Sequence, residues 1–394
     1  MLKVSKDFIF FLFLSLLLVA FSIVGIYALR ADLDPYGGGL KTIQAYIALA
    51  IELCCLVFIA NNLKHFRITG LTLFVSIWLF IIIILGILTS GYRIFKDLIY
   101  VSLWPITYIT AFLLTRKDKS YLNRSKYIFI YIFIIAIFFF FIIVTQLRSL
   151  NPFSYISASN HIFYPLLLTP WILLINRSLF RNTLIIILFF SALVSFKRSA
   201  IIIVCIISLF YIFVGYLRKK SKYNVLKYFV ASSMIVIFFY VFSIYNNYSE
   251  GYITDRLENI QNDEGSGRIS IWKDIIEIQK ESNLFEWIFG HGHFTVIDYY
   301  HYSAHNDFIE VLFNYGLIAF ILYVLLYFIL FKRFIHFRKK NNSIYISYGA
   351  SLIIFITLSI VSHLIVYHTY FIYLAFYWGA IEAIAINETK VLTT

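Results

Sequence analysis

Long apolar runs follow one another through almost the whole of this 394-residue chain. Backbone N–H and C=O groups find no water in the hydrocarbon core of a membrane, so such runs must form helices, and each crossing needs about 20 residues. The chain is therefore predicted to be an all-α integral membrane protein with about twelve transmembrane helices. We place them at 8–29, 42–62, 69–89, 97–115, 127–147, 161–176, 183–197, 199–217, 228–245, 305–331, 343–366 and 369–386.

The composition excludes a soluble fold for a chain of this kind. Hydrophobic residues make up 61% of the sequence and charged residues 13%, whereas soluble domains have roughly 25% charged residues. The three cysteines, Cys54, Cys55 and Cys205, all fall inside apolar runs. Neither a disulfide framework nor a thiolate metal site is expected.

The distribution of positive charge predicts the orientation of the helices. The formal net charge is +13, and 22 of the 33 Lys and Arg residues fall in alternate segments that begin with the N-terminus. In a membrane protein such an excess marks cytoplasmic loops rather than a nucleic-acid surface. The first apolar run lacks a small-residue cleavage site, so we expect a retained helix and not a signal peptide. Both termini are predicted to be cytoplasmic.

This orientation leaves one long segment on the outer side. The chain then divides into an N-terminal bundle of about nine helices (1–245), a long periplasmic loop region (246–304) and about three C-terminal helices (305–394). Within the loop, apolar residues after Ser266 recur with helical spacing and predict an amphipathic helix. Arg268 would lie in its first turn, where a cation opposes the helix dipole unless an anion is bound. Pairing of Arg268 with Asp263 or Glu264 is the competing interpretation.

A second cationic site interrupts an apolar stretch. Lys197 and Arg198 have no acidic neighbour in sequence and indicate a tight turn at the membrane surface. Ionisable residues at such a position are usually functional, although these side chains can also reach lipid headgroups. Together Arg198 and Arg268 would suit a diphosphate, because each guanidinium presents paired donors to phosphate oxygens.

Histidines gather at the end of the long loop. His291, His293, His301 and His305 fall within a short stretch, and His301 and His305 have the i, i+4 spacing of a helical zinc site. The surroundings of this pair look irregular and Gly290-His291-Gly292-His293 is typical of a backbone turn, so no metal is expected. His305 stands where the loop re-enters the membrane and is suited to take a proton from a hydroxyl. Its neighbour Asn306 could orient the ring, and a purely structural role at the helix start stays open for His305.

Four acidic residues offer alternatives. Asp32 and Asp34 could bind a divalent metal, but Asp34-Pro35 followed by three glycines is typical of a turn. Glu52 and Glu382 are acids deep in predicted spans, and two such residues are thin support for a proton-coupled transporter.

The order of these motifs resembles the O-antigen ligase and polymerase superfamily. The resemblance covers about residues 190–330 and rests on short motifs in a fixed order: Lys197-Arg198-Ser199, Gly267-Arg268 with Trp272, Gly290-His291-Gly292, Ala304-His305-Asn306-Asp307-Phe308 with Glu310, and Asn314-Tyr315-Gly316-Leu317. One departure is Gly-His-Gly-His in place of a commoner Gly-x-Gly, which leaves the roles of His291 and His293 open.

The resemblance implies a metal-independent inverting glycosyltransferase of the type C membrane class, without a cofactor. Its substrates would be glycans carried on undecaprenyl diphosphate at the outer face of the bacterial inner membrane. Arg198 and Arg268 would hold the diphosphate and His305 would activate the acceptor hydroxyl, with Lys197, His291, His293 and Asn306 as substrate contacts. Membrane lipids and a chain-length regulator are the expected partners, and nucleic acid is not.

The favoured function is a polymerase that joins lipid-linked repeat units into O-antigen or capsular polysaccharide. The alternatives are an O-antigen ligase that transfers the glycan to lipid A core and, from another class, a lipid-linked sugar flippase. A flippase would carry charges through many spans, whereas Lys and Arg are nearly absent from the predicted span interiors.

Overall fold

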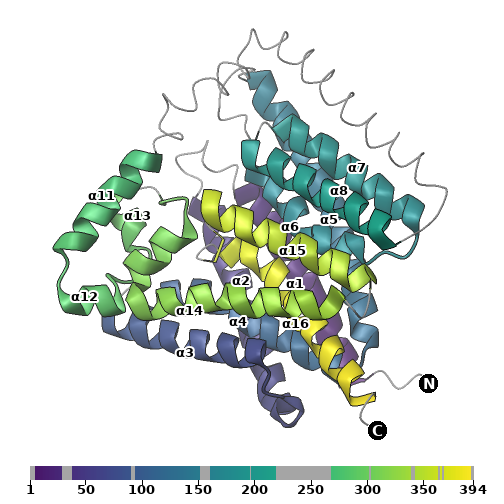
Figure 1. Ribbon diagram of the computed structural model, residues 1–394, viewed down its shortest axis with the longest axis horizontal. Helices are drawn as coiled ribbons and strands as arrows, with labels where there is room; N and C mark the ends of the chain where they lie inside the picture. The colour runs from purple at the N-terminus through teal and green to yellow at the C-terminus, as the bar shows by residue number, and fades with distance from the viewer. Residues whose placement is uncertain are drawn as a thin grey trace.

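The computed structural model describes residues 5–28, 38–89, 94–150, 160–195, 197–218, 268–300, 303–338, 342–362, 364–365 and 368–391. Within these ranges the regular structure is entirely helical, with no strand (Figure 1). The prediction of an all-α fold is confirmed.

Nine helices in the described part of the chain are long and apolar enough to cross a membrane. They coincide with nine of the predicted spans, and the chain is a multi-pass integral membrane protein. The predicted span 199–217 corresponds to α8 (Arg198–Arg218), whose apolar stretch, Arg198–Val214, is shorter than in the nine. The predicted span 228–245 lies outside the described residues. The nine are α1 (Lys6–Ala28), α2 (Gly38–Asn62), α3 (Gly70–Thr89), α4 (Ile94–Lys117), α5 (Ser120–Leu150), α7 (Ser178–Ser195), α14 (Asp307–Arg338), α15 (Asn342–Val361) and α16 (His368–Val391).

The sixth predicted span, 161–176, is wrong in its length. A short 3₁₀ turn, η5 (Asn160–Ile162), leads into α6, which runs only from Phe163 to Leu173. Its 11 residues cover about 17 Å, roughly half of the hydrocarbon thickness. Every residue of α6 is buried, and Trp171 stacks on Phe129 of α5 with ring centroids 4.6 Å apart. Other helices therefore enclose the whole of this short helix.

The centre of the bundle is formed by α16 and α4, which pack along each other. In the most apolar stretch of α16 and of α4, 89% and 78% of the residues are buried, against 44% in α1, α3 and α5. Around this pair, α1 and α2 pack on one side, while α3 and α14 pack together on another (Figure 1). The C-terminal helices are thus part of the same bundle as the N-terminal ones, and the division at 245 and 304 stays a prediction.

Three short helices lie at one end of α14 and α3 (Figure 1). They are α11 (Arg268–Glu281), α12 (Leu284–Phe289) and α13 (Thr295–Tyr300). We call this end of the bundle, which carries residues 268–300 and 303–306, the loop face. The start of α14 and the end of α15 both lie here, because Asn306 and Arg268 bond the last carbonyls of α15.

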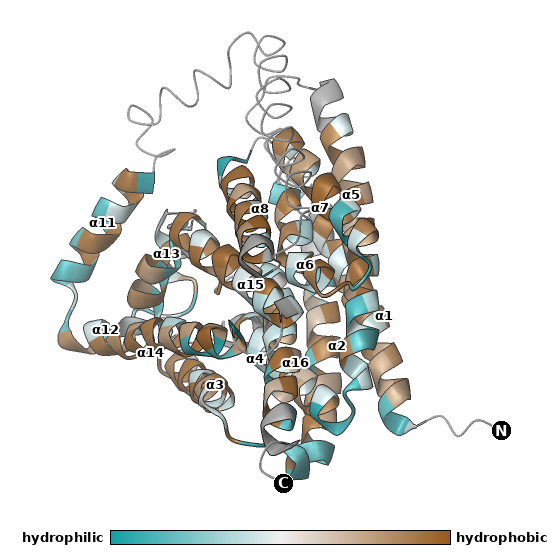
Figure 2. Cartoon of the chain, turned by 45° about the vertical axis from the view of Figure 1, so that its right-hand side comes forward, coloured by the Kyte–Doolittle hydropathy of each residue, from teal (hydrophilic) through white to brown (hydrophobic). Residues whose placement is uncertain are grey.

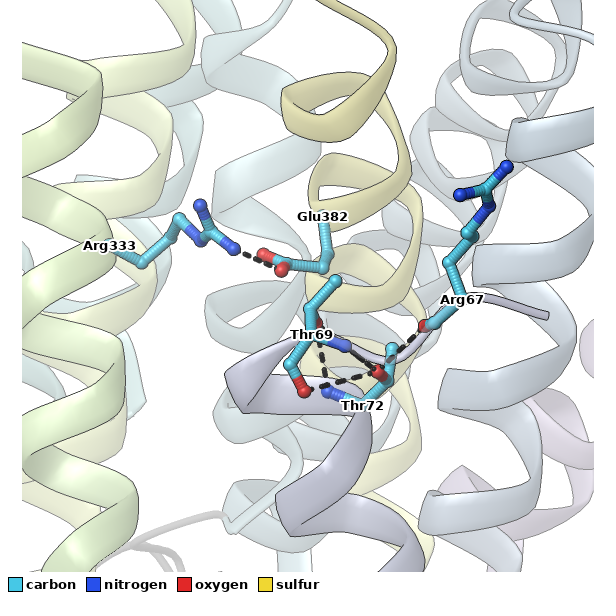
Figure 3. A network of polar contacts seen from close by, with 5 residues as sticks. All are labelled: Arg67, Thr69, Thr72, Arg333 and Glu382. Carbon is cyan, nitrogen blue, oxygen red and sulfur yellow. Dashed lines mark hydrogen bonds and ion pairs between the residues drawn. The ribbon is translucent and has the colours of Figure 1, made fainter. Parts of the chain in front are cut away.

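Two polar contacts secure the opposite end of the bundle (Figure 3). Thr69 and Thr72 cap the start of α3 by reciprocal backbone-to-hydroxyl bonds of 2.7 and 3.1 Å, which satisfies N–H groups that a helix start leaves open. Beside them Arg333 of α14 forms an ion pair with Glu382 of α16. One of the two deep acids is therefore neutralised by a partner that sequence reasoning had not paired with it.

Candidate active site

The helix predicted after Ser266 is present as α11. Its buried residues are Ile275 and Gln279, and Ile275 belongs to a small apolar core that also holds Val296, Ala304 and Phe313. Hydrophilic and apolar patches alternate along the helix, as expected for one covered face (Figure 2). α11 therefore covers the segment that leads to His305.

The Gly290-His291-Gly292 motif forms a backbone turn against the first part of α14. Gly290 and Gly292 have φ angles of +81° and +116°, and the N–H groups of His291 and Gly292 donate to the carbonyls of Phe313 and Asn314 at 2.9 and 3.0 Å. A Cβ on Gly290 would lie 2.3 Å from the Asn314 carbonyl oxygen. The glycines are required by this close approach of two backbones.

Gly316 completes the same contact from the other side. Its φ of +72° breaks α14 into two helical parts, and a Cβ there would lie 2.3 Å from the carbonyl oxygen of Ile288. Two motifs that are 26 positions apart, at Gly290 and Gly316, thus meet through their backbones. Their role is to fix the kink that brings the start of α14 under α11 and α12.

His291 and His293 pack against the first part of α14. The Nε2 of His291 lies 3.0 Å from the Ser282 hydroxyl, and its ring stacks on Phe313 with centroids 4.2 Å apart. His293 is buried against Tyr315, with centroids 5.1 Å apart, and touches α3 at Gly86. Burial lowers the pKa of both residues, that of His293 to about 4. These contacts favour a structural role, and the predicted substrate contacts stay a prediction.

His305 lies in the segment between α13 and α14 with a strained backbone. Its φ is +53°, a left-handed conformation that non-glycine residues rarely adopt. The Nδ1 of its half-buried ring lies 3.4 Å from the Ser303 hydroxyl. The indole N–H of Trp272 in α11 donates to the carbonyl of the preceding Ala304 at 2.6 Å. Neighbouring groups therefore hold this backbone in a conformation it would not adopt alone.

Three factors lower the pKa of His305 to about 4. The largest is burial of the ring, followed by the positive charges of Arg268 and Lys197. These two cations come from α11 and from the turn before α8, so the fold brings together three residues that are far apart in sequence. An imidazole in this environment is neutral at physiological pH and can accept a proton.

Arg268 opens α11 and reaches across to α15. Its Nη1 donates to the carbonyl of Val361 at 2.6 Å, where the end of α15 presents carbonyl groups that favour a cation. The alternative partners Asp263 and Glu264 lie outside the described residues. Arg268 thus links the loop face to α15, and its positive charge lowers the pKa of His305.

Lys197 and Arg198 occupy the predicted tight turn. α7 ends at Ser195 and α8 begins at Arg198, and the Ser195 hydroxyl accepts a hydrogen bond from the N–H of Lys197 at 3.2 Å. The prediction of a turn here is confirmed. Lys197 is the member of the pair whose charge acts on His305, while Arg198 lies one residue further on in the first turn of α8.

Asn306 caps the start of α14. Its side-chain oxygen accepts hydrogen bonds from the N–H groups of Phe308 and Ile309 at 3.0 and 3.3 Å. Its side-chain nitrogen donates to the carbonyl of Ile360 at 3.2 Å. The Ser303 hydroxyl lies beside the ring, and the orientation of the ring by Asn306 and its contact with substrate stay predictions. An Asn directly before a helix start is a capping signal that was visible in the sequence.

Two buried carboxylates follow His305 in the first turn of α14, Asp307 and Glu310, to which the sequence analysis gives no role. Asp307 accepts hydrogen bonds from the N–H groups of Leu364 and Ile365 at 2.8 and 3.2 Å and from the Tyr323 hydroxyl at 3.1 Å. Glu310 lies in the same first turn of α14 and is 2% exposed. The signal that could have found them is a pair of acids one helical turn apart in an otherwise apolar helix.

The candidate metal ligands do not assemble in the described part of the chain. No three His, Cys, Asp or Glu side chains within the described ranges come together in a way that could hold an ion. His301, Asp32 and Asp34 lie outside those ranges.

Comparison with known families identifies the region that holds these residues. Residues 183–324 match the family model described as O-antigen ligase, a range that begins in α7 and ends within α14 and includes Lys197, Arg268 and His305. No curated protein matches the chain. Residues 183–324 are therefore similar to the O-antigen ligase family, which supports the resemblance to the O-antigen ligase and polymerase superfamily.

Proposed function

We propose that this protein is a polymerase that joins undecaprenyl-diphosphate-linked repeat units into O-antigen or capsular polysaccharide. The observation that carries the proposal is the convergence of Arg268 and Lys197 on a half-buried, neutral imidazole at His305. Glycosyl transfer from a lipid diphosphate needs both kinds of group, cations for the leaving group and a base for the attacking hydroxyl.

The reaction is a single displacement with inversion at the anomeric carbon. His305 takes the proton of the acceptor hydroxyl as its oxygen bonds to that carbon, and the bond from the carbon to the diphosphate oxygen breaks. The diphosphate leaves with its negative charge stabilised by Arg268, Arg198 and Lys197. The same negative charge, once bound, opposes the two cations and raises the pKa of His305, so the base is stronger in the complex than in the free protein.

No metal ion takes part in this scheme, because the cationic side chains supply the charge stabilisation that an ion would give. We assign the site to the periplasmic face of the bacterial inner membrane and both termini to the cytoplasm. The support is the distribution of 22 of the 33 Lys and Arg residues over the alternate segments that include the termini. A chain-length regulator is the proposed protein partner.

A ligase that transfers finished glycan to lipid A core is the second candidate. The observation in its favour is that the matching family model is described as O-antigen ligase. A flippase is less well supported. Glu382 is held in an ion pair with Arg333 and Glu52 accepts a hydrogen bond from Ser102 at 2.7 Å, so both deep acids stabilise helix packing.

Deletion of the gene separates the two enzymes. Lipopolysaccharide from a polymerase mutant should carry core with a single repeat unit, whereas a ligase mutant should show bare core and retain lipid-linked polymer. Purified protein should then elongate lipid-linked units equally well with and without EDTA. Activity that disappears in EDTA and returns with a divalent cation would overturn the metal-free mechanism and favour the histidines or Asp32 and Asp34 as ligands.

A further inference from the structure

We propose that α12 is a membrane anchor whose exposed apolar side chains lie among the lipid headgroups on the loop-face side of the bilayer. The first two of its six residues, Leu284 and Phe285, are 76% and 50% exposed. Adjacent apolar side chains that are this exposed indicate a contact with a partner or with a membrane. The position of α12 relative to the lipid-facing surface of the bundle decides between the two.

The lipid-facing surface of α14 begins beside α12. Every residue of α14 before Leu317 is buried or half-buried, and its large exposed apolar side chains begin at Leu317 and end at Ile335. The rise between these two positions is about 27 Å, close to the roughly 30 Å of the hydrocarbon core. The kink at Gly316 therefore lies where α14 leaves the hydrocarbon.

α3 reaches the same boundary independently. Its last large exposed apolar side chains are Ile87 and Leu88, and a Cβ on the adjacent Gly86 would lie 2.4 Å from the Nε2 of His293. His293 follows closely after Gly290, the residue that caps the end of α12. Two helices thus place the C-terminal end of α12 at the edge of the hydrocarbon, at the end that α3 and α14 share (Figure 1).

The exposed residues of α12 lie within the headgroup layer. A Cβ on Gly316 would lie 2.3 Å from the carbonyl oxygen of Ile288, and Leu284 is one helical turn before Ile288, about 6 Å along the axis. The headgroup layer adds roughly 5–7 Å to each side of the hydrocarbon core. Leu284 and Phe285 therefore stay within this layer, whichever way α12 is turned.

Local contacts hold these side chains in a fixed arrangement. A helix this short is unstable alone, but Asn283 and Glu286 cap its start through two reciprocal hydrogen bonds of 3.0 Å. The ring of Phe285 contacts that of Phe289 with centroids 4.8 Å apart, and Phe289 packs against the main core. Trp287 of the same helix is half-buried, and Trp is typical of a membrane interface.

α11 presents a different surface. Besides Ile269 and Ile276, its exposed side chains include charged residues along the helix: Lys273, Asp274, Glu277, Lys280 and Glu281. Such a face is suited to water. The exposed face of α12 instead adjoins the lipid-facing surface of α14, and a protein that covered it would have to enter the headgroup layer. Lipid is therefore the occupant that these observations favour.

The anchor fixes the height of the loop face relative to the membrane. The turn after α12 is bonded to the first part of α14 through the N–H groups of His291 and Gly292, and this part of α14 directly follows His305. The headgroup layer is also where the diphosphate of a lipid-linked substrate lies, so α12 holds His305 at the level of its substrate. This consequence rests on the proposed function, while the anchor itself does not.

Spin labels in the full-length protein, reconstituted in lipid nanodiscs, measure the depth of α12. A nitroxide is attached to a single cysteine, Phe285→Cys, Lys280→Cys or Ile321→Cys, in a background without the native cysteines. Its relaxation by oxygen, which concentrates in the bilayer, is compared with its relaxation by a water-soluble nickel chelate. We expect the ratio of oxygen to nickel accessibility at 285 to be at least ~3-fold that at 280. It should stay below the ratio at 321, a position that is exposed in the lipid-facing part of α14.

Kinetics test the consequence for catalysis. Leu284→Ser combined with Phe285→Ser should raise KM for lipid-linked units by ~5-fold or more with kcat nearly unchanged, because the site is no longer held at the headgroups. Leu284→Phe combined with Phe285→Leu keeps the apolar contact and should retain the normal KM. Both double variants should keep the melting temperature, since the side chains that they change are exposed.

Two results at position 285 would overturn the anchor. One is nickel accessibility equal to that at 280, which would place α12 in water. The other is shielding from both reagents, which would indicate a cover of protein, either from the same chain or from a second copy. A normal KM in the double serine variant would remove the consequence for catalysis and leave the anchor standing. Absence of glycosyl transfer by the unchanged protein would contradict the proposed function, while the depth measurement still decides whether α12 is an anchor.

Discussion

His305 is a weak base in the free protein because burial and two neighbouring cations disfavour its charged form. Its pKa of about 4 means that the neutral, proton-accepting form is fully present at pH 7 and is lost only as pH falls through about 4. We predict that kcat/KM is flat between about pH 5 and 8 and declines at lower pH. In kcat the decline should begin at higher pH, because the bound diphosphate raises the pKa.

Initial rates of polymer elongation across this pH range test the assignment, with His305→Ala as the control. That variant should lose ~10²–10⁴ in rate and with it the acidic limb of the profile. A limb near the ordinary histidine pKa of about 6.5 in kcat/KM would show that the base is not held in the environment described.

Arg268 should affect both the rate and the pH profile. Its charge lowers the pKa of His305, so Arg268→Ala should move the acidic limb of kcat/KM to higher pH while it reduces the rate by ~10-fold or more. Arg268→Lys keeps the charge and the position of the limb, but loses the paired donors and should still be slow.

Lys280→Ala is the matched control for Arg268, since Lys280 is exposed near the other end of α11. It should leave both rate and profile unchanged. An Arg268→Ala enzyme with normal rate would contradict a role for Arg268 in binding the diphosphate.

At the scale of elements, the kink of α14 determines where the segment that carries His305 lies. Gly316 has a φ of +72°, and a Cβ on it would lie 2.3 Å from the Ile288 carbonyl oxygen. We predict that Gly316→Ala costs at least ~2 kcal/mol of stability, because it adds a left-handed alanine to a backbone clash.

The measurement is thermal unfolding of the purified protein, where Gly316→Ala should lower the melting temperature by about 2 °C or more. Gly70→Ala serves as the control, because nothing lies within 4 Å of a Cβ at the start of α3. Equal melting temperatures for the two variants would mean that the close approach of the Gly290 and Gly316 backbones does not support the fold.

For the whole molecule, the decisive property is which end of the bundle lies on the outer side of the membrane, where we propose the site to be. Single cysteines in a background without Cys54, Cys55 and Cys205 can report it. Lys280 on α11 and Lys119 between α4 and α5 are both exposed lysines. We predict that Lys280→Cys reacts with an impermeant thiol reagent in intact spheroplasts and that Lys119→Cys does not. Permeabilised cells should label both, and the reverse pattern in intact cells would move the proposed site to the cytoplasm.

Much of the architecture could be predicted from local sequence. The apolar runs identified α1 to α5, α7 and α14 to α16 because a membrane-spanning segment must satisfy its own backbone and reveals itself by composition and length. The turn at Lys197, the amphipathic α11 and the backbone turn at Gly290 could also be predicted, because each depends on residues that are close in sequence. The short length of α6 was not predicted, because an apolar run looks the same in sequence whether lipid or other helices surround it.

The sequence by itself determined the class of the protein, the order of its helices and the residue types available for chemistry. Only the tertiary structure decided which of them meet. It brought Lys197 and Arg268 to His305, buried His293 against α3 and used Asn306 as a helix cap. These relations depend on how helices distant in sequence pack, and the energy of such contacts depends on burial and distance, which no local pattern of residues contains.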